Sequence, residues 1–429
     1  MPFYFFNGGI MQNTFKLSNG LRVVTEIIPT AKSISVGVWI ETGSRNENKL
    51  NNGISHFIEH MMFKGTEKRT ALELAENIEN VGGQMNAFTG RESTCYYIKA
   101  LDEHLELTLD ILSDMLFNSV FSQEEIEKEK GVVLEEINMT EDSPEDVLSD
   151  LHSTAIWGED SISLPILGTV ETVKSFTRAD LIEYISSYYI PENSVISICG
   201  NFQEDELKFL LEKYFSSWKC SEYKKLTNYS SPLIQNNILY KDKPIEQVHF
   251  SLGLGGYALG DDMVYTLNLI SNILGGGASS ILFQKIREEL GLCYSIYSYM
   301  SSYNNTGTLN IYAGLSPKFT EQALSVIKDE LAEFAERGID ENLLNTTKNK
   351  IKAGYILGLE STSSRMFANG KTLLFLNKVN SQEDIMNKID SIDEKKVKIV
   401  LNDIIKKGII NAAFVGNSIE LESVSSILL

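Results

Sequence analysis

The segment His-Phe-Ile-Glu-His, residues 56–60, restricts the local fold more than any other part of this sequence. Residues four apart lie on one face of an α-helix, about one turn from each other. His56 and His60 can therefore reach the same metal ion if the segment is helical, and Glu59 then lies close enough to face a water on that ion. Neutral imidazole nitrogen is a good zinc ligand, and a catalytic zinc needs three protein ligands and an open position. The spacing predicts a metal-binding helix over residues 53–63.

The motif is uncommon in a chain of this composition. The sequence holds only five histidines, so a chance match to H-x-x-E-H is expected roughly once in a few hundred such chains. The pattern is the inverse of H-E-x-x-H and marks the inverzincins. A water on zinc becomes acidic enough to attack a carbonyl, with the glutamate as its general base. The alternative interpretation is two surface histidines beside an ordinary carboxylate.

Length and charge limit the classes of protein that remain. A chain of 429 residues exceeds one ordinary core and predicts two to four domains. The net charge of −20 argues against nucleic acid and anionic membrane surfaces as partners, and no apolar run is long enough to span a bilayer. The four cysteines are scattered without a C-x-x-C pair, which is typical of reduced thiols, so a cytoplasmic protein is expected.

Hydrophobic periodicity predicts alternating strands and helices in the first half of the chain. In chain order we expect a hairpin over residues 14–26, a strand over 34–40, the metal helix, a helix over 70–81, a strand segment over 84–97 broken by a turn at Gly90, helices over 102–119 and 122–141, and an apolar strand over 195–200.

The second half restarts this order after a polar, non-periodic stretch. The strand expected over residues 248–254 corresponds to residues 34–40, and the helix around residues 267–274 occupies the place of the metal helix but carries no histidine. This repetition predicts a duplicated chain with one metal site. The predicted division is a metal-binding half (1–215), a linker (216–237) and a second half without metal ligands (238–429).

The third zinc ligand cannot be selected from helical position alone. Several glutamates in the helix expected over residues 122–141 are equally available: Glu124, Glu125, Glu127, Glu135 and Glu136. However, Glu136 lies 76 residues beyond His60 and Glu129 lies seven before Glu136. This spacing resembles the pitrilysin/insulinase (M16) zinc metallopeptidases. The resemblance implies that Glu136 is the third ligand and that Glu129, two turns away on the same helix face, orients a ligand. The alternative is two solvated glutamates.

The resemblance continues along nearly the whole chain and is similar to the processing-peptidase branch of the family. The segments that carry it are residues 17–23, 43–45, 56–66, 82–89, 164–169 and 189–193. In residues 82–89 it implies a strand whose backbone, around Asn86 and Ala87, adds an extended peptide as a further strand. Without the family, Asn86 would be interpreted as a turn or strand-end residue.

Two more residue pairs match the family by spacing. Asp146 and Asp150, one turn apart, match an acidic pair that binds a substrate arginine; the alternative is that they complement a helix dipole. Arg287 and Tyr294 match a pair in which the arginine holds substrate backbone and the tyrosine donates a hydrogen bond to the developing oxyanion. The alternative for this pair is a surface arginine and a core tyrosine, and whether the pair acts in its own chain or on a partner stays open.

Together, the residues and the resemblance predict an α+β fold. Two homologous halves, each a mostly antiparallel sheet with helices packed on it, are expected to form a clam-shell chamber. The implied function is a zinc-dependent endopeptidase with one Zn2+ per chain, cleaving unstructured peptides or presequence-like segments and acting as a homodimer without nucleic acid or membrane partners. The rival functions are a non-catalytic scaffold subunit of the same fold and a structural zinc protein, whose fourth ligand would be Cys or His.

Overall fold

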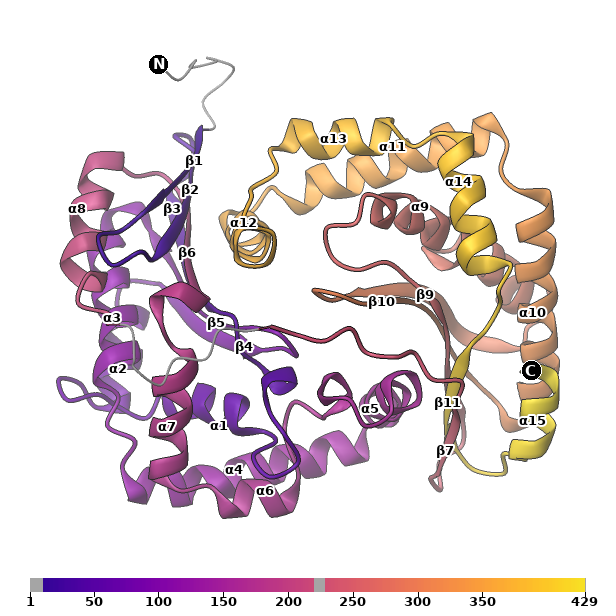
Figure 1. The fold of residues 1–429 in the computed structure, drawn as a ribbon, viewed down its shortest axis with the longest axis horizontal. Coiled ribbons are helices and arrows are strands. Elements are labelled where there is room, and N and C mark those ends of the chain that lie inside the picture. Colours follow the sequence, from indigo (N-terminus) through magenta and orange to yellow (C-terminus); the bar gives the residue numbers. More distant parts are fainter. Residues whose placement is uncertain (1–10, 220–227, 429) are drawn as a thin grey trace. The chain divides into compact units, whose positions relative to one another are not determined.

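The structure is a computed structural model that describes residues 11–219 and 228–428. By contacts the chain forms two compact units, each built from three separate stretches of sequence. Unit 1 comprises the described residues of Met1–Ile137, Pro165–Asn228 and Ile356–Ser381, and unit 2 those of Asn138–Leu164, Tyr229–Tyr355 and Gln382–Leu429. Each unit contains one sheet with helices packed against it (Figure 1).

The sheet of unit 1 has six strands in the order β1-β2-β6-β3-β5-β4, which places β4 at an edge. All neighbouring strands are antiparallel except β2 and β6. The strands are β1 (Met11–Lys16), β2 (Arg22–Ile27), β3 (Ser33–Ile40), β4 (Gln84–Thr89), β5 (Thr94–Leu101) and β6 (Ser194–Gly200).

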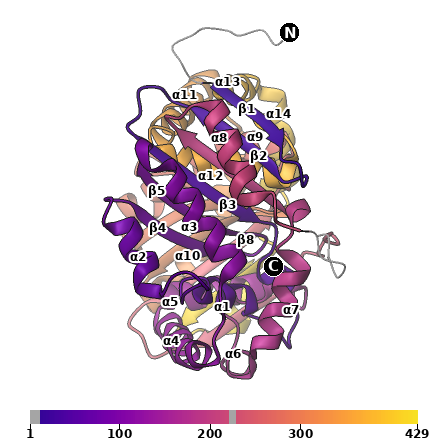
Figure 2. The ribbon, with the colours of Figure 1, turned by 90° about the vertical axis from the view of Figure 1, so that its left-hand side faces the viewer.

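Helices of the first sequence half cover one face of this sheet. Apolar side chains of β3 at every second position, including Ile34, Val36 and Val38, enter a core shared with these helices. Figure 2 looks onto this face, where α3 and α8 lie over the strands. The helices of unit 1 in the first half are α1 (Ile54–Met61), α2 (Ala71–Glu79), α3 (Leu105–Asn118), α6 (Val170–Ser175), α7 (Arg178–Tyr188) and α8 (Glu204–Phe215), with α4 (Gln123–Asp142) continuing past the boundary of the unit.

The opposite face of the sheet is covered by α12 (Thr362–Leu376), which comes from the second half of the sequence (Figure 1). Two glycines allow this close approach: a Cβ on Gly37 would collide with Met366 Sδ, and one on Gly370 would collide with Trp39 Nε1. Leu373 of α12 packs in a cluster with Trp39 and residues of β2, β5 and β6. Both faces of the sheet are therefore buried, which explains why β3 is buried at nearly every position.

Unit 2 repeats this arrangement. Its five strands follow the order β7-β11-β8-β10-β9, and only β7 and β11 are parallel. This is the order and orientation of β2-β6-β3-β5-β4 in unit 1. The strands are β7 (Ile238–Asp242), β8 (Val248–Gly255), β9 (Cys293–Ser302), β10 (Gly307–Leu315) and β11 (Asn411–Gly416); the helices are α9 (Met263–Gly275), α10 (Thr320–Arg337), most of α11 (Glu341–Gly358), α13 (Gln382–Asp390), α14 (Glu394–Val400) and α15 (Leu421–Leu428).

One face of the second sheet is covered by α5 (Pro144–Trp157), a helix of the first sequence half. Val147 and Leu148 of α5 pack against Ala413 and Val415 of β11. The units of packing thus differ from the halves predicted along the sequence, because α5 and α12 each cover the sheet of the other half. We call these two segments the crossing helices.

The predicted α+β class with two similarly built halves is confirmed, and the expected strands and helices are present with small shifts at their ends. No helix among the described residues is long and apolar enough to cross a bilayer. Cys95, Cys199 and Cys293 are free thiols, while Cys220 and part of the predicted linker lie outside the described residues.

Candidate metal centre

The helix α1 is fixed at its first turn by a buried carboxylate. Glu47 accepts hydrogen bonds from the backbone N–H of Gly53 at 2.6 Å and of Ser55 at 2.8 Å. The first N–H groups of a helix lack intrahelical partners and carry partial positive charge, so a carboxylate there satisfies both needs. Phe57 and Met61 are buried in the core of unit 1. Packing and capping together set the direction in which the motif side chains point.

Three predicted ligands converge in unit 1. Glu136 Oε2, from α4, lies 3.6 Å from His56 Nε2 and 3.5 Å from His60 Nε2. One ligand atom from each residue lies within 4.8 Å of the other two, and no other group of three such side chains is found among the described residues. The arrangement joins two turns of α1 to the middle of α4.

The donor set fits a zinc ion. Tetrahedral bonds of about 2.0–2.1 Å to nitrogen and oxygen place neighbouring ligand atoms about 3.3 Å apart, close to the separations found here. Glu136 Oε2 and His56 Nδ1 are buried without a hydrogen-bond partner among the described residues. A buried carboxylate oxygen without a partner is costly, and a cation between the three ligands would remove that cost for Glu136. Among the described residues, no fourth Cys or His joins this cluster.

Glu129 lies behind His60, on the side away from Glu136. Its Oε1 is 2.7 Å from His60 Nδ1, and its Oε2 is 2.5 Å from Lys64 Nζ. Burial alone would lower the pKa of His60, but the hydrogen bond and charge of Glu129 outweigh burial and raise it. Burial alone would raise the pKa of Glu129, but His60 and Lys64 outweigh burial and lower it. An ionised Glu129 thus holds the proton on His60 Nδ1 and leaves Nε2 directed at the cluster.

His56 differs from His60 in its protonation. Burial, followed by the charge of His60, lowers the pKa of His56 to about 3. The imidazole is therefore neutral at physiological pH, which is the form that binds a metal ion.

Glu59, the predicted general base, is held by a residue of β4. Its Oε2 accepts a hydrogen bond of 2.5 Å from Thr89 Oγ1. Burial raises the pKa of Glu59, and the bond from Thr89 partly counteracts this. A base whose pKa is raised toward neutrality is better suited to proton transfer. Sequence reasoning assigned no role to Thr89, Lys64 or Glu47, since only their contacts single them out.

Asn86 and Ala87 lie in the middle of β4, an edge strand of the unit 1 sheet. β4 pairs with β5 on one side, and no described strand pairs with its other side. Asn86 is exposed, and its Oδ1 accepts a hydrogen bond from its neighbour Ala87 N at 2.8 Å. The backbone of β4 is therefore placed as strand addition would require.

The remaining predicted residues belong to unit 2. Asp146 and Asp150 lie on α5, where Ser143 Oγ accepts a hydrogen bond from Asp146 N as the N-cap. The guanidinium of Arg287 lies 5.3 Å from the ring centre of Tyr294, so the structure brings this pair together. Tyr294 is 75 % exposed, and the alternative interpretation of a core tyrosine is therefore wrong.

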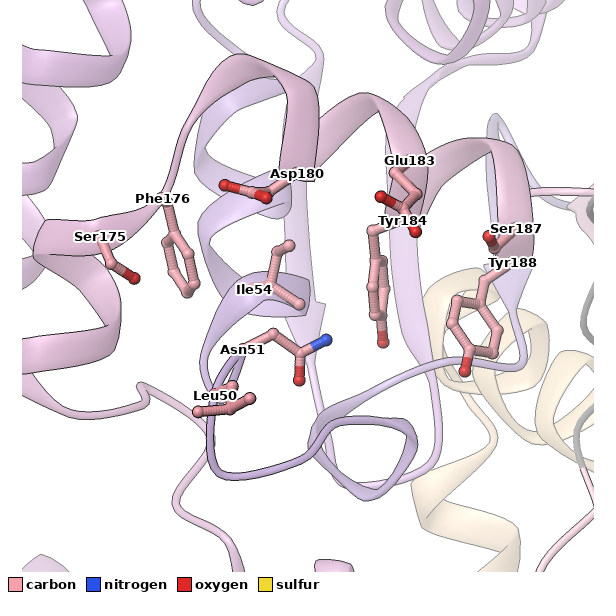
Figure 3. A pocket seen from close by; sticks show the side chains of 10 residues that line it. All are labelled: Leu50, Asn51, Ile54, Ser175, Phe176, Asp180, Glu183, Tyr184, Ser187 and Tyr188. Carbon is pink, nitrogen blue, oxygen red and sulfur yellow. The ribbon is translucent and has the colours of Figure 1, made fainter.

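A pocket of about 400 Å³ lies between α7 and the loop that precedes α1 (Figure 3). Figure 3 shows Tyr184 and Tyr188 of α7 on one side and Asn51 and Ile54 on the other. The hydroxyl of Tyr184 is hydrogen-bonded to Ser55 Oγ at 2.9 Å. None of the three clustered ligands lines this pocket, so the metal centre is a separate feature of unit 1.

Comparisons with known families agree with the fold. Residues 22–170 match the Insulinase (Peptidase family M16) family, and residues 175–351 match the Peptidase M16 inactive domain. The chain belongs to the M16 family of zinc-dependent peptidases.

Several bacterial proteins are similar to this chain. The uncharacterized zinc protease YmxG of Bacillus subtilis (strain 168) is 44% identical over 387 residues, covering 90% of this chain and 94% of that protein. An uncharacterized zinc protease of Streptomyces coelicolor is 35% identical over 91% of this chain and 86% of that protein.

Solved structures share the fold at lower identity. A protease from Helicobacter pylori has a TM-score of 0.88 at 24% identity, over 95% of this chain and 99% of that one. A putative M16-like peptidase from Alicyclobacillus acidocaldarius has a TM-score of 0.80 at 20% identity, over 95% of this chain and 99% of that one.

Proposed function

We propose that this chain is a zinc-dependent endopeptidase that cleaves unstructured peptides. The observation that carries the proposal is the convergence of His56, His60 and Glu136 on one point, where a buried carboxylate oxygen has no hydrogen-bond partner among the described residues. Glu59 precedes His60 in the same helix and so stands next to this point. A scaffold protein would need neither the ligand set nor a positioned base.

The residues of the chain divide the work of peptide hydrolysis. His56, His60 and Glu136 hold the ion, and Glu129 orients His60. When bound, Zn2+ supplies a Lewis acid for a carbonyl oxygen and makes a water molecule more acidic. Glu59 accepts a proton from the attacking water as the new C–O bond forms. It then delivers a proton to the amine nitrogen as the C–N bond breaks, so that the products are a carboxylate and an amine.

The edge strand β4 supports extended peptide as the substrate class. No described strand pairs with its outer edge, so an extended peptide can add there alongside Asn86 and Ala87, whereas a folded protein cannot supply a free strand. A preference for basic side chains at Asp146 and Asp150, and substrate contacts from Arg287 and Tyr294, are further parts of the proposal. We further propose a homodimer, from the likeness to the short processing-peptidase branch, and a location in the cytoplasm, from the scattered cysteines.

The test is hydrolysis of a quenched-fluorescence library of unstructured, arginine-containing peptides, with zinc content measured on every sample. Wild type should cleave, chelated protein should not, and Glu59→Gln should keep its zinc but lose activity. Glu135→Gln, an exposed glutamate beside the ligand Glu136, is the matched control and should cleave like wild type. Equal inactivity of all zinc-loaded forms would reject the peptidase and favour the scaffold function.

A further inference from the structure

Thr89 connects the edge strand to the predicted base. It is the last residue of β4, and its side chain follows the alternation of that strand: Gln84, Asn86 and Phe88 are exposed, while Met85, Ala87 and Thr89 are half-buried on the opposite side. The half-buried side faces α1, which packs against β4. A hydroxyl at the last inward position therefore reaches the helix that carries the metal motif.

The position of Thr89 is fixed by its own hairpin. Thr89 pairs with Thr94 in the ladder between β4 and β5, and Gly90 N donates to Ser93 O at 2.8 Å to close the turn. The hydroxyl of Thr94 donates to the carbonyl oxygen of Thr42 at 2.9 Å, so its single hydrogen is already used. Thr94 Oγ1 lies 3.4 Å from Thr89 Oγ1 and leaves the Thr89 hydrogen for Glu59.

The bond from Thr89 restrains a side chain that otherwise has three free torsions. Among the described residues, no other side chain is hydrogen-bonded to the Glu59 carboxylate. A hydrogen bond to an ionised carboxylate is stronger than one between neutral groups, and the Thr89 hydroxyl donates to Oε2 of this carboxylate. Because Thr89 engages Oε2, the other oxygen, Oε1, is left to exchange protons.

We infer that Thr89 is a positioning residue, which holds Oε2 of Glu59 and ties the base to the strand that receives the peptide. This inference rests on the proposed endopeptidase function. In this inference, the side chain of the final residue of β4 has a different role from the backbone of the strand. Its one hydrogen bond sets the distance between the base and the bound peptide. Thr89 contacts the base and not the peptide, so its loss should lower kcat and leave KM nearly unchanged.

The decisive substitution is Thr89→Val, which keeps the shape and removes the hydroxyl. A displaced catalytic group can cost up to about 10²-fold in rate, so we expect kcat to fall roughly 10- to 100-fold. Thr89→Ser keeps the hydroxyl and should recover most of the loss. The matched control is Thr25→Val in β2 of the same sheet, because Thr25 Oγ1 is buried without a partner and its removal should leave kcat unchanged.

The experiment compares kcat, KM and zinc content of wild type and these variants, together with crystal structures of the zinc-free proteins. The structures should show Glu59 bonded to residue 89 in wild type and Thr89→Ser, and displaced in Thr89→Val. Should Thr89→Val not fold, Thr89→Ala is judged by the same criteria.

Three outcomes overturn the inference while leaving the peptidase intact: an unchanged kcat in Thr89→Val, a serine variant as slow as the valine variant, or a rise in KM alone. Zinc-loaded wild type that cleaves nothing overturns both the inference and the proposed function.

Discussion

Replacing Glu129 by glutamine should weaken zinc binding by roughly 10- to 100-fold, the range typical of residues that orient a metal-binding histidine. Glu129 is 3 % exposed, so water cannot take over its contacts. Its two oxygens are 2.7 Å from His60 Nδ1 and 2.5 Å from Lys64 Nζ. In the variant, the amide oxygen can still accept from His60, but the amide NH2 then faces the lysine ammonium, donor against donor. The expected factor corresponds to about 1.4–2.7 kcal/mol, in line with the value of one hydrogen bond to a charged group.

Chelator competition at neutral pH measures this affinity directly. Glu135→Gln is the control, because it makes the same chemical change on an exposed face of the same helix, α4. Circular dichroism checks that both variants remain folded. Equal zinc affinity of the Glu129 and Glu135 variants would refute the reasoning, since it would mean that the hydrogen bond to His60 contributes nothing to ligand orientation.

Three further predictions concern stability. Burial lowers the pKa of His152 from about 6.5 to about 4, so the unfolded chain takes up the proton first as pH falls. The free energy of unfolding should therefore fall as the pH drops from 6.5 to 4, by about 2 kcal/mol at pH 5. Urea unfolding of His152→Gln should show a weaker pH dependence than that of wild type. Chelation should lower the thermal midpoint of the zinc-loaded protein without unfolding it. The free energy of unfolding should fall by about 2.7 kcal/mol if free zinc had been at 100 times its Kd. An apo-protein that is already unfolded in calorimetry would contradict this prediction. Gly370→Ala should cost roughly 1–3 kcal/mol by overpacking Trp39, whereas Gly354→Ala, with open space around it, should not destabilise.

The parts of the fold that could be predicted from the sequence are those coded by neighbouring residues. The metal helix, the strand over residues 34–40 and the turn at Gly90 each depend on a short pattern, and each is present. His56, His60 and Glu59 come from one such pattern. Glu136 does not: its exposed neighbours look alike, and only the resemblance to a family separated it from them.

The contacts that could not be predicted join distant parts of the chain. Ser35 Oγ lies 2.9 Å from Thr362 Oγ1, 327 residues later, and no local periodicity indicates which sheet α12 will cover. The bond between Thr89 and Glu59 depends in the same way on the packing of β4 against α1. Apolar spacing shows that a helix has a face to bury, but the surface that receives it is chosen by shape and by the order of the whole fold.

The crossing helices determine the order in which the two sheets can be completed during synthesis. The last strand of the unit 1 sheet, β6, leaves the ribosome long before α12, and at about 5–20 residues per second the interval is roughly 9–35 s. During that time the face bearing Val24, Trp39 and Val195 lacks the helix that later buries it. In the same way, α5 is synthesised before β11, the strand against which it packs. Neither half can finish folding from its own sequence, so two separately translated halves would each carry a bare sheet face and a helix that belongs to the other fragment.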